Sequence, residues 1–587
     1  MSTPPIPTTE PSTASTAAAT SDCSKYLEGR VIPGLAGLLW GILVLGVFVV
    51  LWCAAVPYIY KRKRQAAIVA SDAEKEQDQR QWLYPYWRWT PRLKKSLVYA
   101  PLWKKRRATP TFFGVLPTKL HALFMASYFV LNVAYMLLLD WSSSEKNIYS
   151  QVRKRSGTIA AANVIPLFVL VARNNLLVRL LGISPDTCSF VHRWIGRIVI
   201  LESVVHVGAW LRPKIAHEGW TAVAAKFRDS PFIITGLVGS IASVLILLQS
   251  LKPLRTAAYE LFRHIHLFLA LVFATATIAH CTVSPRPPQR AFVVTGVIIL
   301  GTERCMRLFW RYYRNNCGRR STLAMVQVML GEPRACRVVM DLPRHVDIKA
   351  GMHAYLSFKE VCPHESHPFS IAWWEDGASL ADVGVDSTKV TFIISAHNGV
   401  SKKLYDHATN QIGRFFRTGA TFEGPYGSHR SLDSYGHVVL FAGGTGITHQ
   451  IAYVRQFLRG YATKKTATRR MVLIWAVREA DPVEWVRSWL WTINGMRAQY
   501  PHILVLRLFI TGTTSLSTHA EDGIEMEAFA GRPPIGSIME TETLQQIGAM
   551  CVSVCGPGGM ADDVRAAVRL AQCSKQAIDF VEESFGW

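Results

Sequence analysis

Four histidines stand at matched positions in two apolar stretches of the chain. His192 and His206 are fourteen residues apart, and His266 and His280 have the same separation. Fourteen residues of an α-helix rise about 21 Å and return nearly to the starting face, so each helix would present two imidazoles on one side. Two such helices side by side would form two His–His pairs at different depths. This predicts two bis-histidine b-type haems, because histidine is a common axial ligand of haem iron.

A structural role is the alternative for these histidines. A single intramembrane histidine usually makes a hydrogen bond to a neighbouring helix, whereas two pairs of equal spacing favour haem. Arg193 and Arg197 lie beside the first pair. They could pair with haem propionates, or extend from the helix end toward the membrane surface.

Two glycine-rich turns near the carboxyl end each follow a predicted strand. The strand Cys551–Cys555 runs into Gly556, and the strand His437–Ala442 runs into the turn Gly443, Gly444, Thr445 and Gly446. Glycines between a strand and a helix let backbone N–H groups approach a phosphate. The spacing differs from the G-x-G-x-x-G dinucleotide fingerprint, so the turns predict a nucleotide site of another kind.

Two further motifs precede these turns. Gly399 and Ser401 stand at the start of a predicted helix, where free N–H groups could bind a pyrophosphate; an ordinary capped helix is the alternative. Upstream, a strand-like run at 351–358 is followed by His367, Pro368, Phe369 and Ser370.

The composition indicates a membrane protein. The chain has 587 residues and a net charge of +24, yet half of its residues are hydrophobic and only 18% are charged. A nucleic-acid-binding protein would be richer in charge, and a disordered chain poorer in apolar residues. The eleven cysteines include no C-x-x-C pair, which argues against a structural zinc site.

Seven segments could cross a bilayer. The fourth of them, 188–211, contains charged residues, including Arg193, Arg197 and Glu202, which should face the bundle interior or a polar cofactor. The segments are 31–60, 120–139, 157–181, 188–211, 231–251, 259–282 and 291–310. With the amino terminus outside, the inside connections hold 24 basic residues and the outside ones 10. This bias predicts a cytosolic carboxyl end. It places His192 and His266 near the cytosol, and His206 and His280 near the outer face.

The expected architecture is a multi-domain membrane protein, an all-α bundle followed by a β-barrel and an α/β domain. We expect a disordered extracytoplasmic tail at 1–30, a first transmembrane helix at 31–60 and a basic, aromatic juxtamembrane segment at 61–118 lying along the membrane surface. A six-helix haem-binding domain follows at 119–312, then a β-barrel at 321–430 and an α/β nucleotide-binding domain at 431–587.

In their order and spacing, the cytosolic motifs resemble the ferredoxin-NADP reductase-like module. The resemblance implies that the run from His367 and the Gly399 loop bind FAD, and that the turns at Gly443 and Gly556 bind NADPH. It implies that Cys555 lies near the nicotinamide and that Trp587 stacks on the flavin. Arg478 would bind the 2′-phosphate, although Thr511-Gly512 stands where the family pattern would have Thr-Arg.

Together with the histidine pairs and the Tyr259-Glu260 element, the module resembles the ferric reductase and NADPH oxidase superfamily over about residues 120–587. Seven spans and equal spacings of fourteen look most like fungal ferric or cupric reductases. The resemblance implies an NADPH-dependent metalloreductase that moves electrons through FAD and two haems b to extracytoplasmic Fe(III) or Cu(II) chelates.

Alternatives stay open at this point. A superoxide-generating NADPH oxidase would share the same motifs, and a non-enzymatic membrane receptor would keep the fold alone. The implied location is a multi-pass protein of the plasma membrane, with the vacuolar membrane as the alternative. The bilayer is the expected partner, and nucleic acid is not. A downstream iron permease or oxidase is compatible with the implied function, but no motif in this sequence indicates such a partner.

Overall fold

The computed structural model of the chain describes residues 41, 48, 52, 55–70, 76–84, 87, 89–103, 117–173, 183–283, 288–376, 387–427, 431–513, 525–572 and 578–583. Most of the predicted first span at 31–60, the tail at 1–30 and Trp587 lie outside the described residues. The chain forms two compact units. One holds most of the membrane helices, and the other holds two sheets together with residues 54–122.

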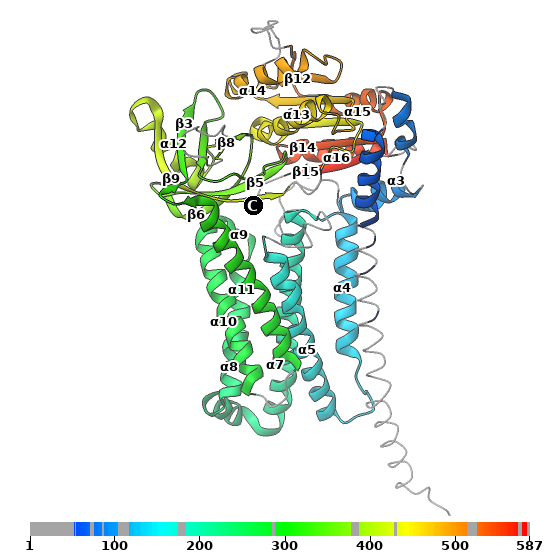
Figure 1. Cartoon of the computed structure of the whole chain (residues 1–587). Coiled ribbons are helices and arrows are strands. Elements are labelled where there is room, and N and C mark those ends of the chain that lie inside the picture. Colours follow the sequence, from blue (N-terminus) through cyan, green and yellow to red (C-terminus); the bar gives the residue numbers. More distant parts are fainter. Residues whose placement is uncertain are drawn as a thin grey trace, which may run out of the picture. The chain divides into compact units, whose positions relative to one another are not determined.

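Five described helices are long and apolar enough to cross a membrane. They are α4 (Lys119–Leu137), α5 (Glu145–Val171), α7 (Pro185–Asp229), α8 (Pro231–Gln249) and α10 (Tyr259–Val283), drawn in cyan to green in Figure 1. The short α9 (Lys252–Ala257) precedes α10, and α11 (Pro288–Asn315) follows it. Helix α11 covers the predicted span 291–310, but its second half carries Glu303, Arg304 and Arg307, so it falls outside the apolar group.

Three helix boundaries differ by ten residues or more from the sequence-based expectation, one of them the end of α5 at Val171 rather than 181. Helix α5 begins at Glu145, well before the expected 157, because no glycine or proline interrupts residues 145–156. The expected outer loop around Arg153 is therefore helical. Helix α7 continues past 211 to Asp229, with a break at Gly219, whose φ is 75°.

The first sheet of the second unit has seven antiparallel strands in the order β6-β5-β9-β3-β4-β8-β7. Alternating side chains such as Val326, Val338 and Phe392 point into its core. Helix α12 (Val400–Thr409) packs on this core through Leu404. The strands are β3 (Leu323–Met329), β4 (Ala335–Leu342), β5 (Met352–Phe358), β6 (Cys362–Ser370), β7 (Trp373–Asp376), β8 (Thr388–Ser395) and β9 (Phe415–Gly427).

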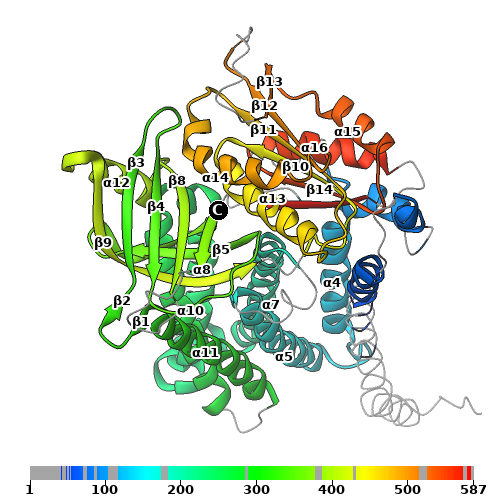
Figure 2. The same cartoon turned by 45° about the horizontal axis from the view of Figure 1, so that its top comes forward.

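The second sheet has six parallel strands in the order β13-β12-β11-β10-β14-β15. Its helices cover both faces, α13 and α14 on one and α15 and α16 on the other (Figure 2), which explains the continuous apolar runs of the central strands. The strands are β10 (His437–Gly443), β11 (Arg470–Val477), β12 (Leu504–Ile510), β13 (Glu527–Ala530), β14 (Met550–Cys555) and β15 (Ile578–Glu583), and the helices α13 (Ile447–Ala462), α14 (Pro482–Arg497), α15 (Ile535–Leu544) and α16 (Gly558–Ala571).

The basic segment 61–118 packs, over its described part, against the parallel sheet. A helix over 55–70 and the short elements η2 (Glu76–Leu83), α3 (Thr90–Leu93) and η3 (Lys94–Val98) carry the contacts. Lys94 Nζ lies 2.5 Å from Asp579 Oδ1 of β15, and the Tyr99 hydroxyl accepts a hydrogen bond from Phe580 N at 3.0 Å. Part of the charge and aromatic area of the segment is therefore used inside the unit, and its expected place along the membrane surface stays a prediction.

Candidate functional site

The four spaced histidines form two facing pairs between α7 and α10. The ring centres of His192 and His266 are 6.4 Å apart, and those of His206 and His280 are 6.3 Å apart. Two imidazoles bound to one metal ion from opposite sides, with metal–nitrogen bonds of about 2 Å, have ring centres about 6 Å apart. The spacing of both pairs therefore fits a bis-histidine haem at each level.

Backbone carbonyls orient three of the four rings. His192 Nδ1 lies 3.0 Å from the Leu167 carbonyl, and His206 Nδ1 lies 2.8 Å from the Arg153 carbonyl. His280 Nδ1 lies 2.8 Å from the Phe232 carbonyl. Ligating histidines usually donate their second ring N–H in this way, which leaves the other nitrogen for the metal.

The fourth ring has a side-chain partner. His266 Nδ1 lies 3.1 Å from the amide nitrogen of Gln249, at the end of α8. The oxygen and nitrogen of an amide are assigned from the hydrogen-bond network. The reversed amide would place the Gln249 oxygen where it accepts from the ring N–H, giving all four histidines the same arrangement.

Two glycines make room for the histidines of one pair. A Cβ at Gly157 of α5 would lie 2.7 Å from His206 Nδ1, and one at Gly236 of α8 would lie 2.9 Å from His280 Nδ1. Both rings therefore rest against bare backbone. Sequence analysis missed Gly157, Gly236 and Gln249, because each contacts a histidine on a helix that is distant in sequence.

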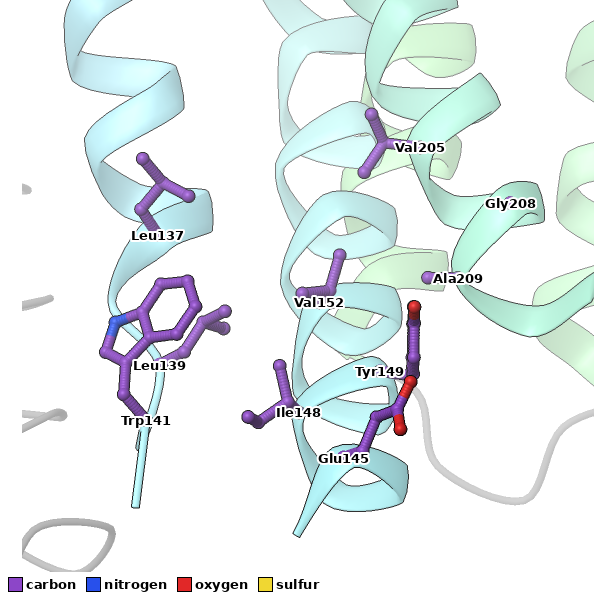
Figure 3. A pocket seen from close by; sticks show the side chains of 10 residues that line it. All are labelled: Leu137, Leu139, Trp141, Glu145, Ile148, Tyr149, Val152, Val205, Gly208 and Ala209. Carbon is purple, nitrogen blue, oxygen red and sulfur yellow. The ribbon is translucent and has the colours of Figure 1, made fainter. Parts of the chain in front are cut away.

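An apolar cavity of about 410 Å³ lies beside Val205, next to His206 in the sequence. Figure 3 shows it between the end of α4, the start of α5 and α7, with Leu139 and Trp141 facing Ile148 and Val152. Its lining is apolar apart from Glu145 and Tyr149. This lining suits an acyl chain better than a charged metal chelate.

The two glycine-rich turns meet at the carboxyl edge of the parallel sheet. Strands β10 and β14 are neighbours, and Ala442 pairs with Cys555. A Cβ at Gly446 would lie 1.9 Å from the Cys555 carbonyl oxygen, and one at Gly556 would lie 2.9 Å from Gly443 N. The strand order reverses between β10 and β14, and open α/β sheets bind ligands at such a switch point.

Cys555 is buried at the end of β14. Burial, helped by the charge of Glu583, raises the pKa of its thiol to about 12. The thiol therefore stays protonated near neutral pH and is a poor nucleophile. A role in packing beside a bound nucleotide fits this environment.

Arg478 is exposed just after β11 at the same edge of the sheet. The Gly512 amide donates to its carbonyl oxygen at 2.9 Å, and a Cβ at Gly512 would lie 2.5 Å from that oxygen. This close approach leaves no room for a side chain at position 512 in this backbone arrangement.

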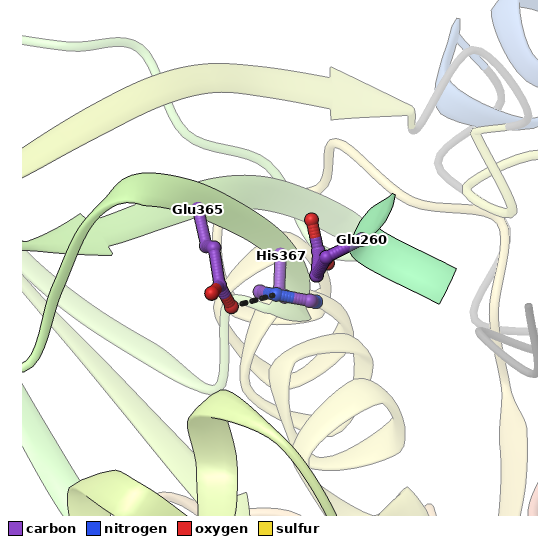
Figure 4. A group of neighbouring side chains, drawn as sticks. All are labelled: Glu260, Glu365 and His367. Carbon is purple, nitrogen blue, oxygen red and sulfur yellow. Dashed lines mark ion pairs between the residues drawn. The ribbon is translucent and has the colours of Figure 1, made fainter. Parts of the chain in front are cut away.

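The motif from His367 to Ser370 forms the end of β6, paired with β5 from Leu356 to His353. His367 Nε2 lies 3.7 Å from Glu365 Oε2 on the same strand (Figure 4). Pro368 and Phe369, which follow His367 on the strand, are half-buried, and Ser370 is buried.

Gly399 comes directly before the first residue of α12, and its φ of 64° favours glycine. Ser401 Oγ accepts a hydrogen bond from His397 N at 3.2 Å and lies 3.2 Å from the Asn398 carbonyl. The hydroxyl thus fixes the loop that leads into the helix. The N–H groups of the first turn of α12, which have no acceptor within the helix, then point in the same direction, as a pyrophosphate site requires.

Sequence profiles of three families match consecutive parts of the chain. The family described as Ferric reductase like transmembrane component matches residues 156–277, FAD-binding domain matches 322–430, and Ferric reductase NAD binding domain matches 435–569. The chain belongs to the ferric reductase superfamily. Within this superfamily, its apolar helices are the transmembrane component, its antiparallel sheet is the FAD-binding domain and its parallel sheet is the NAD-binding domain.

Two fungal relatives illustrate the similarity. Probable cell surface ferric reductase kap2 of Aspergillus oryzae is 24% identical over 384 residues, which cover 64% of this chain and 49% of that protein. Ferric reductase transmembrane component 4 of Saccharomyces cerevisiae is 22% identical over 535 residues, covering 81% and 69%. The chain thus spans about half the length of the Aspergillus protein. Among solved structures, a ferredoxin NADP+ reductase from Neisseria gonorrhoeae with bound FAD and NADP is 13% identical with a TM-score of 0.31, covering 45% of this chain and 98% of that one.

Proposed function

We propose that the chain is a transmembrane NADPH-dependent reductase of Fe(III) or Cu(II) chelates. The observation that carries this proposal is the pair of facing histidine pairs in the same chain as FAD-binding and NAD-binding domains. An electron path across a bilayer requires redox groups at two depths in the membrane. Both relatives named above are called ferric reductases, which supports metal chelates as acceptors.

In the membrane, His192 and His266 would hold one haem b, and His206 with His280 would hold the other. Bound haem supplies a one-electron carrier at each level. The protein's part is to fix the rings: the carbonyls of Leu167, Arg153 and Phe232 each set one tautomer.

In the cytosolic domains, the start of α12 at Gly399 and the β6 motif from His367 would hold FAD. Flavin converts the two-electron chemistry of NADPH into one-electron transfers. The turns at Gly443 and Gly556 would bind NADPH, and Arg478 would hold its 2′-phosphate. Cys555 would pack beside the nicotinamide and Trp587 would stack on the flavin. Electron transfer of this kind needs no general acid or base from the chain.

The distribution of basic residues supports a cytosolic carboxyl end, so that electrons leave toward the outside. Reduction of extracellular chelates implies the plasma membrane, and we propose this location. The acceptor would approach the level of His206 and His280.

The acceptor is tested with membranes that hold the protein, given NADPH and an impermeant Fe(III) chelate. We expect chelate reduction that persists when superoxide dismutase is present. Complete loss of reduction with the dismutase would mean that superoxide is the product, which would make the chain an NADPH oxidase. Absence of NADPH oxidation with any acceptor would favour a non-enzymatic role instead.

A further inference from the structure

A buried carboxyl lies among the membrane helices. Glu202 of α7 is completely buried, and both of its carboxylate oxygens accept from Asn163 Nδ2 of α5, at 3.1 and 3.0 Å. The same Nδ2 lies 2.8 Å from Asn132 Oδ1 of α4, and the Tyr128 hydroxyl donates to Asn163 Oδ1 at 2.5 Å. One polar network thus joins three helices around a single acidic group.

This acid has no cationic partner within the part of the chain that the structure describes. Its hydrogen bonds go to Asn163 and to none of the four paired histidines. Glu218 of the same helix is the contrast, because it is exposed and ion-paired with Lys214. An ionised carboxylate buried among membrane helices is costly unless a positive charge lies near it. Glu202 therefore needs either a proton or a cation that the described side chains do not supply.

The sequence position of Glu202 indicates where that cation would come from. It lies one helical turn before His206, about 6 Å along the helix, and about 15 Å beyond His192. A bis-histidine haem core is positively charged when its iron is ferric and neutral when its iron is ferrous. A haem at the His206 level would therefore change the charge beside Glu202 each time it is reduced.

We propose that Glu202 is a redox-linked proton-binding site, which rests on the proposed haem at His206 and His280. In the oxidised protein the carboxylate balances the positive haem. If a haem held there gained one electron, the carboxylate would take up one proton from water; on reoxidation the electron would pass to the acceptor and the proton would return to water. Charge inside the membrane would thus stay constant, and the Asn163 amide donor would stabilise the ionised form of the acid.

Other titratable groups on the packed helices are engaged elsewhere or belong to the same network. The Tyr128 phenol of α4 is part of the network. The Arg155 guanidinium of α5 lies over the Tyr135 ring, 5.4 Å from its centre. His206 of α7 faces His280 of α10. Glu202 is the acid among these groups, so it is the residue to test.

A purely structural network would hold the helices together without exchanging protons. Glu202→Gln separates the two roles, because glutamine keeps the shape and a hydrogen-bonding oxygen but cannot ionise. The measurement is a redox titration of the haem absorption bands in the purified full-length protein at several pH values. Glu218→Gln is the matched control, an exposed acid removed from the same helix.

In the wild type and in Glu218→Gln we expect the midpoint potential of one haem to fall as the pH rises. In Glu202→Gln this dependence should disappear, and the infrared difference band of a protonated carboxyl that forms on reduction should disappear with it. A slope that is the same in Glu202→Gln and the wild type overturns the proposal. A wild-type protein without b-type absorption would instead refute the haem assignment of the proposed function.

A second variant keeps the test decisive if Glu202→Gln does not fold. Asn163→Leu removes the donor to the carboxylate and leaves the acid in place. The protonated form is then favoured, so the pH range over which the potential changes should move upward. A profile that stays at its wild-type position in Asn163→Leu contradicts the proposal.

Discussion

At the scale of single residues, Gly157 leaves the space that the His206 ring occupies. Gly157→Ala would place a methyl group 2.7 Å from His206 Nδ1 and displace the ring from the Arg153 carbonyl. Losing such an orienting contact typically weakens metal binding about tenfold or more. We expect purified Gly157→Ala to retain less haem and to show altered absorption of the remaining haem, while NADPH still reduces the flavin.

The matched control is Gly208→Ala, since a Cβ at Gly208 of α7 meets nothing within 4 Å. It should keep the wild-type haem content. Equal haem content in both variants would contradict the account of Gly157.

Arg478 carries the second prediction at this scale. As an exposed cation beside Gly512 at the nucleotide edge, it should bind the 2′-phosphate of NADPH, which NADH lacks. Arg478→Ala should raise KM for NADPH about tenfold, the usual cost of one charged hydrogen bond, and leave KM for NADH unchanged. Steady-state kinetics with both nucleotides decides this; equal changes for the two would assign Arg478 another role.

At the scale of elements, the segment before the membrane bundle is held against the edge strand β15. Burial alone would raise the pKa of Asp579, but the charges of Lys94 and Lys61 outweigh it and hold that pKa well below its usual range. Burial alone would lower the pKa of Lys94, but Asp579 raises it above its usual range. Removing one member of such a pair leaves a half-buried charge without its main partner.

Lys94→Met should therefore loosen β15, with a local cost of about 1 to 2 kcal/mol, because the pair is half-buried and Lys61 stays beside Asp579. Hydrogen–deuterium exchange of the full-length protein should show faster exchange in β15, whereas Arg92→Met, which removes an exposed cation from the same segment, should not. The same β15 exchange in Lys94→Met and in the wild type would show that the pair does not anchor the strand.

The pH dependence of this anchor follows from the two pKa directions. The contribution of Asp579 is fully present above the ordinary aspartate pKa of about 4 and is lost as the pH falls through its lower folded value. That of Lys94 is fully present below about 10.4 and is lost as the pH rises through its higher folded value. Once corrected for intrinsic rates, the protection of β15 that depends on Lys94 should be constant from about pH 5 to 9.

The central strands were predictable because they are buried on both faces, so that β10, β11, β12 and β14 appear as apolar runs. Strand β15 was not, because Asp579 and Glu582 interrupt its apolar pattern. Their partners Lys94 and Arg565 are visible only in the fold. The four histidines were predictable because their regular spacing on two helices is visible in the sequence. Gly157 and Gln249 were not, because they lie on other helices and their contacts with the histidines are visible only in the fold.

At the scale of the whole molecule, each of the two units holds a different set of functional residues. One has the two histidine pairs and the buried Glu202, and the other has the nucleotide edge and the FAD-binding motifs. Neither proposed site needs a catalytic acid or base, so transfer across the bilayer would depend on how many redox groups the chain holds. Two haems allow transfer across the bilayer, whereas one would leave a large gap in the path.

The most direct test is an anaerobic NADPH titration of the purified protein that follows flavin and haem absorption and counts haem per chain. We expect the flavin to be reduced first and two b-type haems per chain to follow, with one haem lost in His206→Ala and flavin reduction retained. A single haem per chain, or reduced flavin with no b-type band, would contradict this expectation.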